Sequence, residues 1–213
     1  ASGGLSQPFI RLGIVQKGSW VEQNAVELAK GADVVIVPVG FDSVLETEHF
    51  DRTFSLPPGQ DELIKQLARV NKNVVVVITA GGGVEMSSWI DKVSGVLHAW
   101  YSGQEGGTAL AEILFGMTNP SGRLPATFER KAEDNPTFNN YYPQNGNKVD
   151  YKEGVFVGYR GYEKNSVQPL FPFGYGLSYT EFKYSNLAVK DLGGGKAQVL
   201  FDIKNVGTRE GAD

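Results

Sequence analysis

The residues best suited to chemistry stand together in one short stretch of the chain. Leu45–Arg52 reads LETEHFDR, which combines three acids with a histidine, a phenylalanine and an arginine. Carboxyl groups can act as general acids, general bases or nucleophiles. A lone glutamate on a loop is nevertheless most often a solvated charge. Residue types alone therefore leave Glu46 and Glu48 as open alternatives for a chemical role.

The stretch lies between a predicted strand and a predicted helix. Residues 34–39 form a continuous apolar run rich in β-branched side chains, which predicts a strand covered on both faces. Pro57 and Pro58 then favour the start of a helix. The expected buried stripe of this helix consists of Leu63, Ile64, Leu67 and Val70.

The surrounding segments predict further strands and helices in alternation. A capping-box pattern at Ser19 and Glu22 predicts a helix that ends near Gly31. Its inward face is expected to hold Val21, Ala25, Leu28 and Ala29. Residues 74–79 and 95–101 predict two more strands, and residues 106–116 predict a helix whose inward side chains are Leu110, Ile113 and Leu114. This order indicates an α/β fold with a mostly parallel sheet between helices.

Three loops are expected at the carboxyl ends of the parallel strands, where ligands of such sheets usually bind. They read FDSVLETEHFDR, AGGGVEM and SGQEGG. The glycine-rich stretch TAGGGVE, residues 79–85, lacks the patterns of phosphate-binding loops. We therefore interpret it as a turn from a strand into a helix.

The pattern changes after Asn119. A long polar, aromatic and turn-rich segment predicts a surface loop, and residues 169–179, PLFPFGYGLSY, resemble a linker. Residues 181–191 and 197–207 alternate like strands of a half-exposed antiparallel sheet. Because two strands rarely form a stable domain, we expect these to be the first strands of an incomplete β-sandwich.

Composition excludes several classes of function. The chain has 213 residues, a net charge of −4 and no cysteine, so no basic character points to nucleic acid and no thiol chemistry is available. The apolar runs are far shorter than the roughly 20 residues of a membrane span. The two histidines, His49 and His98, are far apart in the sequence and predict no metal site, and no cofactor is expected. The first residues do not resemble a signal peptide, so the signal of an exported protein would lie outside this sequence.

Several long segments, in this order along the chain, resemble one known family. They are ADVVIVPVG, ETEHFDR and LPPGQDELI, then WYSGQEGGTALAEILFGMTNPSGRLPATF, and finally DYKEGVFVGYRGYE and PLFPFGYGLSYTEF. Together they resemble the carboxyl-terminal part of the β-glucosidases of glycoside hydrolase family 3. The similarity runs from about Trp20 to the end of the chain.

The resemblance implies a domain organisation. Residues 1–19 would be an inter-domain linker, residues 20–160 the α/β sandwich domain, residues 161–180 a second linker, and residues 181–213 a truncated fibronectin type III-like domain. Family members of this type also have an amino-terminal (β/α)8 barrel, which this sequence lacks. We expect a secreted or periplasmic location in preference to a cytoplasmic one.

The resemblance also implies roles for the residues of the opening stretch. The family carries its acid/base glutamate three residues before an Asp-Arg pair, and this position is Glu48. His49 stands where glycine is usual, and it and Phe50 are expected to shape the site or contact substrate. Asp51 and Arg52 are interpreted as a loop-bracing ion pair. Glu46 is the main competitor of Glu48.

The function that the resemblance implies is part of a retaining β-glucosidase. Such an enzyme hydrolyses terminal β-D-glucosyl residues of β-glucosides or oligosaccharides, with its nucleophilic aspartate on the barrel. This chain alone would be inactive. The alternative is a non-catalytic carbohydrate-binding or structural accessory domain. A family phosphorylase or N-acetylglucosaminidase fits less well, since those relatives tend to carry the acid/base on the barrel.

Overall fold

The structure is a computed structural model that describes residues 20–48, 52–142 and 148–212. The helices of the described residues are α1 (Gln23–Lys30), α2 (Gln60–Val70), α3 (Gly106–Leu114) and α4 (Tyr159–Lys164), with two 3-10 helices, η1 (Ile90–Lys92) and η2 (Ala132–Asp134). The strands are β1 (Val35–Gly40), β2 (Val74–Thr79), β3 (Gly95–His98), β4 (Phe182–Gly193) and β5 (Lys196–Asn205). None of these helices has the length and apolarity needed to cross a membrane.

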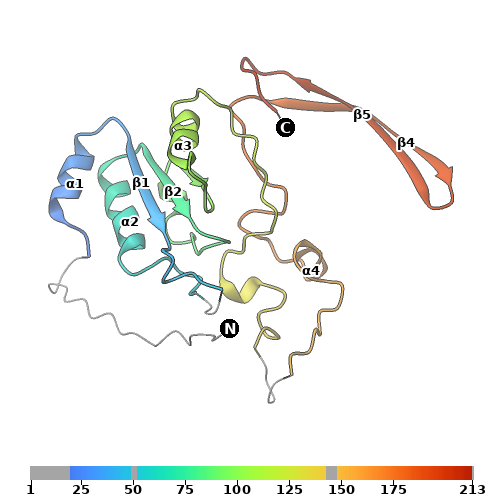
Figure 1. The fold of residues 1–213 in the computed structure, drawn as a ribbon, viewed down its shortest axis with the longest axis horizontal. Coiled ribbons are helices and arrows are strands. Elements are labelled where there is room, and N and C mark those ends of the chain that lie inside the picture. Colours follow the sequence, from blue (N-terminus) through green and yellow to red (C-terminus); the bar gives the residue numbers. More distant parts are fainter. Residues whose placement is uncertain (1–19, 49–51, 143–147, 213) are drawn as a thin grey trace.

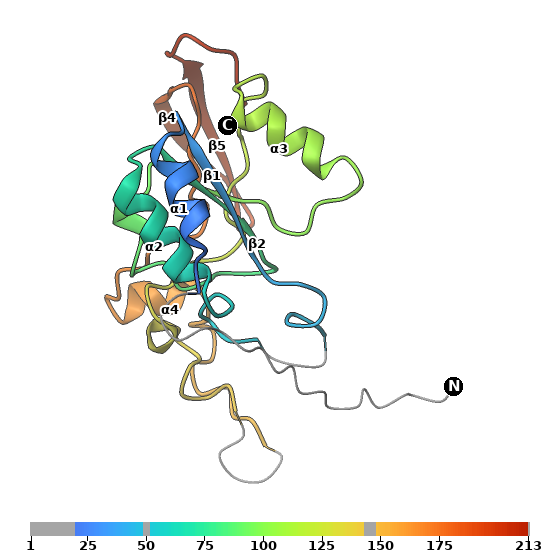
Figure 2. The same ribbon diagram turned by 90° about the vertical axis from the view of Figure 1, so that its left-hand side faces the viewer.

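A three-stranded parallel sheet, in the order β1-β2-β3, forms the centre of the fold. Val37 pairs with Val76, and Ile78 pairs with His98. The strands lie between α1 and α2 on one side and α3 on the other (Figures 1 and 2). The α/β architecture predicted from the sequence, with a parallel sheet and flanking helices, is confirmed.

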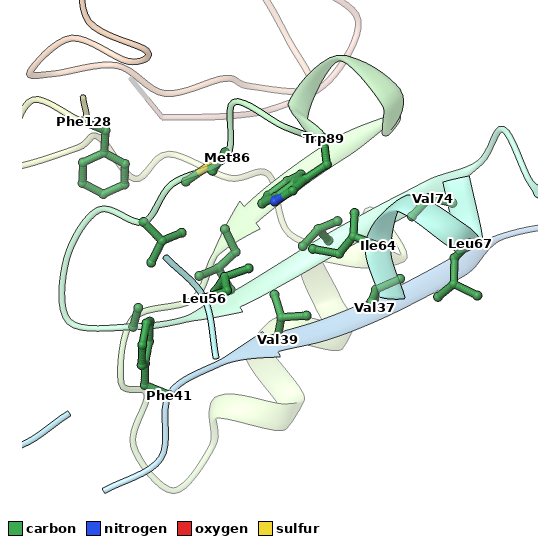
Figure 3. Close-up of a cluster of buried hydrophobic side chains, with 14 of the residues drawn as sticks. Val37, Val39, Phe41, Leu56, Ile64, Leu67, Val74, Met86, Trp89 and Phe128 are labelled. Atoms are coloured by element: carbon green, nitrogen blue, oxygen red, sulfur yellow. The ribbon is translucent and has the colours of Figure 1, made fainter. Parts of the chain in front are cut away.

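The core lies between α2 and the sheet (Figure 3). Ile64 and Leu67 of α2 are buried against the strands, as predicted, whereas Leu63 and Val70 are only partly buried at its edge. Trp89 is fully buried, and its indole N–H donates a hydrogen bond of 2.8 Å to the carboxylate of Asp61 on α2. Burial raises the pKa of Asp61, while the Trp89 hydrogen bond and the charge of Lys65 oppose that rise.

Four local predictions are wrong. Helix α1 begins at Gln23, with Glu22 rather than Ser19 at its N-cap position, and Leu28 is 68% exposed because α1 buries mainly Ala29. Strand β1 is not covered on both faces, since Ile36 is exposed. The glycine-rich stretch after β2 does not turn directly into an α-helix, because the next helix is the 3-10 helix η1.

Differences of detail remain in the second half. Strand β3 ends at His98, short of residue 101, and the predicted inward side chains of α3 are half-buried. Helix α4 was not predicted, because its sequence YRGYEK carries little apolar periodicity. It follows the predicted surface loop and buries Tyr162.

The carboxyl-terminal strands form an antiparallel hairpin, as predicted (Figure 1). Gly194 and Gly195 form its two-residue turn, and they and Gly193 at the end of β4 have a positive φ, between 61° and 76°, which side chains disfavour. Contrary to the expected half-exposed sheet, the apolar side chains of both strands are extensively exposed, for example Leu187 at 71% and Val189 at 66%.

The core predicts a strong dependence of stability on Ile64. We expect Ile64→Ala to lower the free energy of unfolding by about 2–5 kcal/mol, since it leaves a cavity in a fully buried site. Leu28→Ala on α1 is the matched control, with an expected change below about 0.5 kcal/mol, because Leu28 is exposed. Urea unfolding followed by circular dichroism measures both, and equal losses would contradict the packing described here.

Candidate functional site

The candidate site lies at the carboxyl-terminal edge of the parallel sheet. Strands β1 and β2 point toward the same end of the molecule, and the segment that contains Glu46 and Glu48 leaves β1 at that end (Figure 1). The glycine-rich segment 81–83 follows β2, and Tyr101 follows β3. The three segments therefore meet at one edge of the sheet, as predicted.

The end of β1 is fixed by Gly40 and Gln60. The side-chain amide of Gln60 accepts a hydrogen bond of 2.8 Å from the Gly40 N–H and donates one of 2.9 Å to the Gly40 carbonyl. Gly40 has a φ of 141°, and a Cβ at this position would lie 2.0 Å from the carbonyl oxygen of Thr79. Only glycine fits here. The backbone at the end of β1, where the loop of the candidate site begins, therefore has one fixed conformation.

A turn at Asp42 then directs the chain to Glu46. One oxygen of the Asp42 side chain accepts hydrogen bonds of 2.9 Å from the N–H groups of Val44 and Leu45. The backbone carbonyl of Asp42 accepts a further bond of 3.0 Å from the Glu46 N–H. Aspartate commonly organises turns in this way. The position of Glu46 is thus determined by local hydrogen bonds.

The carboxylate of Glu46 joins the three segments of the edge. Its Oε1 accepts a hydrogen bond of 2.8 Å from Nε of Arg52, which follows in the segment after β1. Its Oε2 accepts one of 3.0 Å from the Gly81 N–H, after β2, and another from the hydroxyl of Tyr101, after β3. Both oxygens are therefore occupied by donors.

These donors keep Glu46 ionised. Partial burial by itself would raise the pKa of Glu46, but the Tyr101 hydroxyl, the Gly81 amide and the Arg52 guanidinium together lower it. Burial, together with the same contact to Glu46, raises the pKa of Tyr101 to about 12. The pair consists of a carboxylate that accepts and a neutral phenol that donates.

Arg52 connects this loop to the glycine-rich segment. Its Nη2 donates a hydrogen bond of 2.8 Å to the carbonyl of Gly83, and its Nη1 donates one of 3.0 Å to the carbonyl of Thr53. The guanidinium carbon lies 4.6 Å from the centroid of the Phe41 ring, within the range of a cation–π contact. Arg52 is therefore held on several sides.

His98 supports the glycine-rich segment from β3. Its Nε2 lies 3.0 Å from the carbonyl oxygen of Gly82, and its ring packs against Trp100 and Phe128, with centroid distances of 4.3 Å and 5.2 Å. Burial lowers the pKa of His98, which favours the neutral ring. A neutral Nε2–H donates to Gly82, which is a structural contact.

The structure places the predicted site residues as follows. Glu48 is exposed, and no hydrogen bond joins it to another of the described residues. His49, Phe50 and Asp51 lie outside the described residues, so their predicted roles stay predictions. Arg52 forms an ion pair with Glu46, and its predicted pairing with Asp51 is not described.

The sequence interpretation missed the contribution of Tyr101 and Gly81. Both belong to loops that were expected at this edge, but nothing in their types indicated a contact with Glu46. The sequence feature that could have indicated a role for them was their position, because each follows shortly after a buried parallel strand. Among the described residues, no group of three or more histidine, aspartate or glutamate side chains could hold a metal ion.

The fold and site define an α/β domain whose polar residues converge at the carboxyl ends of parallel strands. Comparison with known families identifies it further. The chain belongs to glycosyl hydrolase family 3, because the sequence model of that family's C-terminal domain matches residues 9–179.

Similar proteins are named as β-glucosidases. Thermostable β-glucosidase B of Acetivibrio thermocellus is 47% identical over 194 residues, which cover 89% of this chain and 25% of that protein. The probable β-glucosidase I of Aspergillus flavus is 49% identical over 167 residues, which cover 78% of this chain and 20% of that protein. The chain thus spans about a quarter or less of the length of these relatives.

Solved structures show the same fold. The crystal structure of a Bifidobacterium adolescentis family 3 β-glucosidase superposes with a TM-score of 0.82 at 42% identity, over 86% of this chain and 27% of the other. A β-glucosidase of Kluyveromyces marxianus in complex with glucose has a TM-score of 0.81 at 38% identity, over 86% of this chain and 22% of the other.

The Glu46 contacts predict a stability that depends on pH. A glutamate whose pKa is lower in the folded state stabilises the fold above its unfolded pKa, and this contribution is lost as pH falls through the folded value. We expect Glu46→Gln to lower the midpoint of thermal unfolding by several degrees at pH 7. The difference from the original chain should shrink as pH falls well below about 4.3, the ordinary pKa of a glutamate.

Thermal unfolding at a series of pH values measures this difference. Glu22→Gln is the control, because Glu22 is exposed and makes no side-chain capping bond. A difference between the Glu46 variant and the original chain that stays constant down to pH 3 would contradict the ionised state of Glu46.

Proposed function

We propose that this chain supplies the general acid/base of a retaining β-glucosidase, and that this residue is Glu48. The nucleophile, an aspartate, would come from a (β/α)8 barrel that is not part of this sequence. Family membership supports the reaction class, since the relatives described above are named β-glucosidases. The substrate would be a β-glucoside or oligosaccharide with a terminal β-D-glucosyl residue.

The observation that supports Glu48 over Glu46 is the difference in their contacts. Both oxygens of Glu46 accept hydrogen bonds, and Arg52 neutralises its charge. A carboxylate held in this way cannot readily take up and release a proton. Glu48 is exposed and has no hydrogen-bond partner among the described residues, so it is available to meet a substrate.

The proposed reaction proceeds in two steps. In the first, the protonated carboxyl group of Glu48 gives its proton to the glycosidic oxygen while the nucleophilic carboxylate bonds to the anomeric carbon and the bond to the leaving group breaks. In the second, the Glu48 carboxylate takes a proton from a water molecule, whose oxygen bonds to the anomeric carbon and displaces the nucleophile. Glucose is released, and both carboxyl groups return to their original state.

The geometry of retaining enzymes determines where the barrel must place its nucleophilic aspartate. The two carboxyl groups of such enzymes lie about 5–5.5 Å apart. The exposed position of Glu48 at the carboxyl edge of the sheet leaves room for a second domain to approach. We expect the barrel to present its aspartate at this edge.

Replacing Glu48 tests the proposal in the assembled enzyme, in which this chain acts together with the barrel. We expect Glu48→Ala to lower kcat/KM for alkyl β-glucosides by about 100-fold or more, because general acid catalysis contributes roughly that much when the leaving group is poor. Activated dinitrophenyl β-glucosides should be affected far less at the first step. Azide should restore part of the turnover by attacking the glycosyl-enzyme.

The matched control is Glu22→Ala, which removes an exposed glutamate outside the loop that contains Glu46 and Glu48. It should leave both substrates unaffected. If Glu48→Ala slows good and poor leaving groups equally, and azide has no effect, Glu48 is not the acid.

A second test uses the 213-residue chain by itself. Because the covalent step needs a nucleophile from the barrel, we expect no hydrolysis of dinitrophenyl β-glucoside above the rate of a Glu48→Ala chain. Robust hydrolysis by the isolated chain that disappears in this variant would show that the nucleophile lies within this sequence, and it would refute the proposed division of the site.

A further inference from the structure

The first glutamate of the ETEHFDR stretch, Glu46, accepts three hydrogen bonds from other parts of the chain. Its carboxylate is the point at which the loop after β1 meets the loops after β2 and β3, through Gly81 and Tyr101. Its side chain is only 20% exposed, although Tyr101 is 53% exposed. The contact therefore sits at the surface end of the sheet and not in the core.

The chain length between Glu46 and Glu48 limits how far Glu48 can move. One residue, Thr47, separates them, and extended chain spans at most about 3.6 Å per residue, so the two Cα atoms stay within about 7 Å of each other. Arg52 lies four residues from Glu48, so the Cα atoms of these two residues can be up to about 14 Å apart. The contacts of Glu46 therefore confine Glu48 more tightly than those of Arg52 do.

Confinement of this kind matters for the reaction. The acid/base and the nucleophile of a retaining enzyme must stand at a defined separation, and a misplacement of about 1 Å can lower the rate about 100-fold. The Glu48 side chain itself has no partner among the described residues that could fix it. Glu46, two residues away along the chain, is tied by its carboxylate to the loops after β2 and β3.

We propose that Glu46 is a positioning residue for Glu48, and that the Tyr101 hydroxyl and the Gly81 amide are the fixed points to which it ties the acid/base loop. This inference rests on the proposed function, since it assigns Glu46 a role only through Glu48. Glu46 does not transfer a proton. Its contacts with the loops after β2 and β3 hold Glu48, the residue that transfers the proton, in place.

Gly81 provides an independent argument. A Cβ on Gly81 would lie 2.9 Å from Oε1 of Glu46 and 3.4 Å from the ring of Tyr101. Cβ atoms essentially never approach another heavy atom so closely, so one of the two groups would have to shift. The φ of Gly81 is not positive, so its backbone does not require glycine. An alanine at this position would therefore displace the Glu46 carboxylate from its present place.

Two variants test the inference in the assembled enzyme. Tyr101→Phe removes one hydroxyl and keeps the ring, while Gly81→Ala keeps every donor but displaces the Glu46 carboxylate. For each, we expect kcat/KM for an alkyl β-glucoside to fall by about 10-fold or more and that for a dinitrophenyl β-glucoside by less than about 3-fold, since only the poor leaving group depends on a placed acid. Thermal unfolding shows whether each variant is folded.

The matched control is Ser55→Ala. Ser55 lies in the same segment and its hydroxyl donates a hydrogen bond of 3.1 Å to Glu85, outside the contacts of Glu46. We expect kcat/KM for both substrates to stay within about 2-fold of the original values. A general loosening of the segment would lower activity in this variant as well, or would slow both substrates equally in Tyr101→Phe and Gly81→Ala, and either result would overturn the inference.

A double variant separates this inference from the proposed function. If Glu46 acts through Glu48, Tyr101→Phe should cause no further loss with the alkyl glucoside once Glu48 is alanine. Losses that multiply would show a separate effect of Tyr101 and would overturn the positioning role. If Glu48→Ala shows the leaving-group dependence and Tyr101→Phe does not, only the inference fails. If Glu48→Ala itself lacks that dependence, the proposed function fails and the inference falls with it.

Discussion

The candidate site depends on the need of one partly buried carboxylate for hydrogen-bond donors. A charged group removed from water must be paired, or the fold loses free energy. The carboxylate of Glu46 obtains a guanidinium, a backbone amide and a phenol from three different parts of the chain. Because each donor follows or neighbours the end of a strand, this one requirement aligns the loops of β1, β2 and β3.

The supporting residues follow from the same requirement. The other nitrogen atoms of Arg52 donate to the carbonyls of Thr53 and Gly83, which fixes the guanidinium beside Glu46. Gly83 in turn belongs to the segment that His98 contacts through Gly82. Trp100, with a φ of 53°, adopts the left-handed conformation that side chains disfavour, and the residue that follows is Tyr101. Local strain of this kind persists where the surroundings determine the backbone.

The sequence predicted the sheet well and the site only in outline. Strand β2 was predicted at its observed residues because all residues of Val74–Thr79 are β-branched and all except Thr79 are apolar. Periodicity failed for Leu28, because a helix at the edge of a domain buries only part of its apolar face. The distinction between Glu46 and Glu48 came from the family resemblance, since both are glutamates of one loop. The contacts of Glu46 could not be predicted, because Gly81 and Tyr101 are 35 and 55 residues away along the chain.

The paired hydrogen bonds between Gln60 and Gly40 have a meaning beyond the placement of the loop. A side-chain amide that both donates to and accepts from one residue imitates the backbone of a neighbouring strand. In the sheet that the described residues form, β1 is an edge strand, and Gln60 blocks this edge at its carboxyl end. An extended segment from any source could add to this edge only before Gly40, so the side of the sheet next to the candidate site is protected against edge-to-edge association.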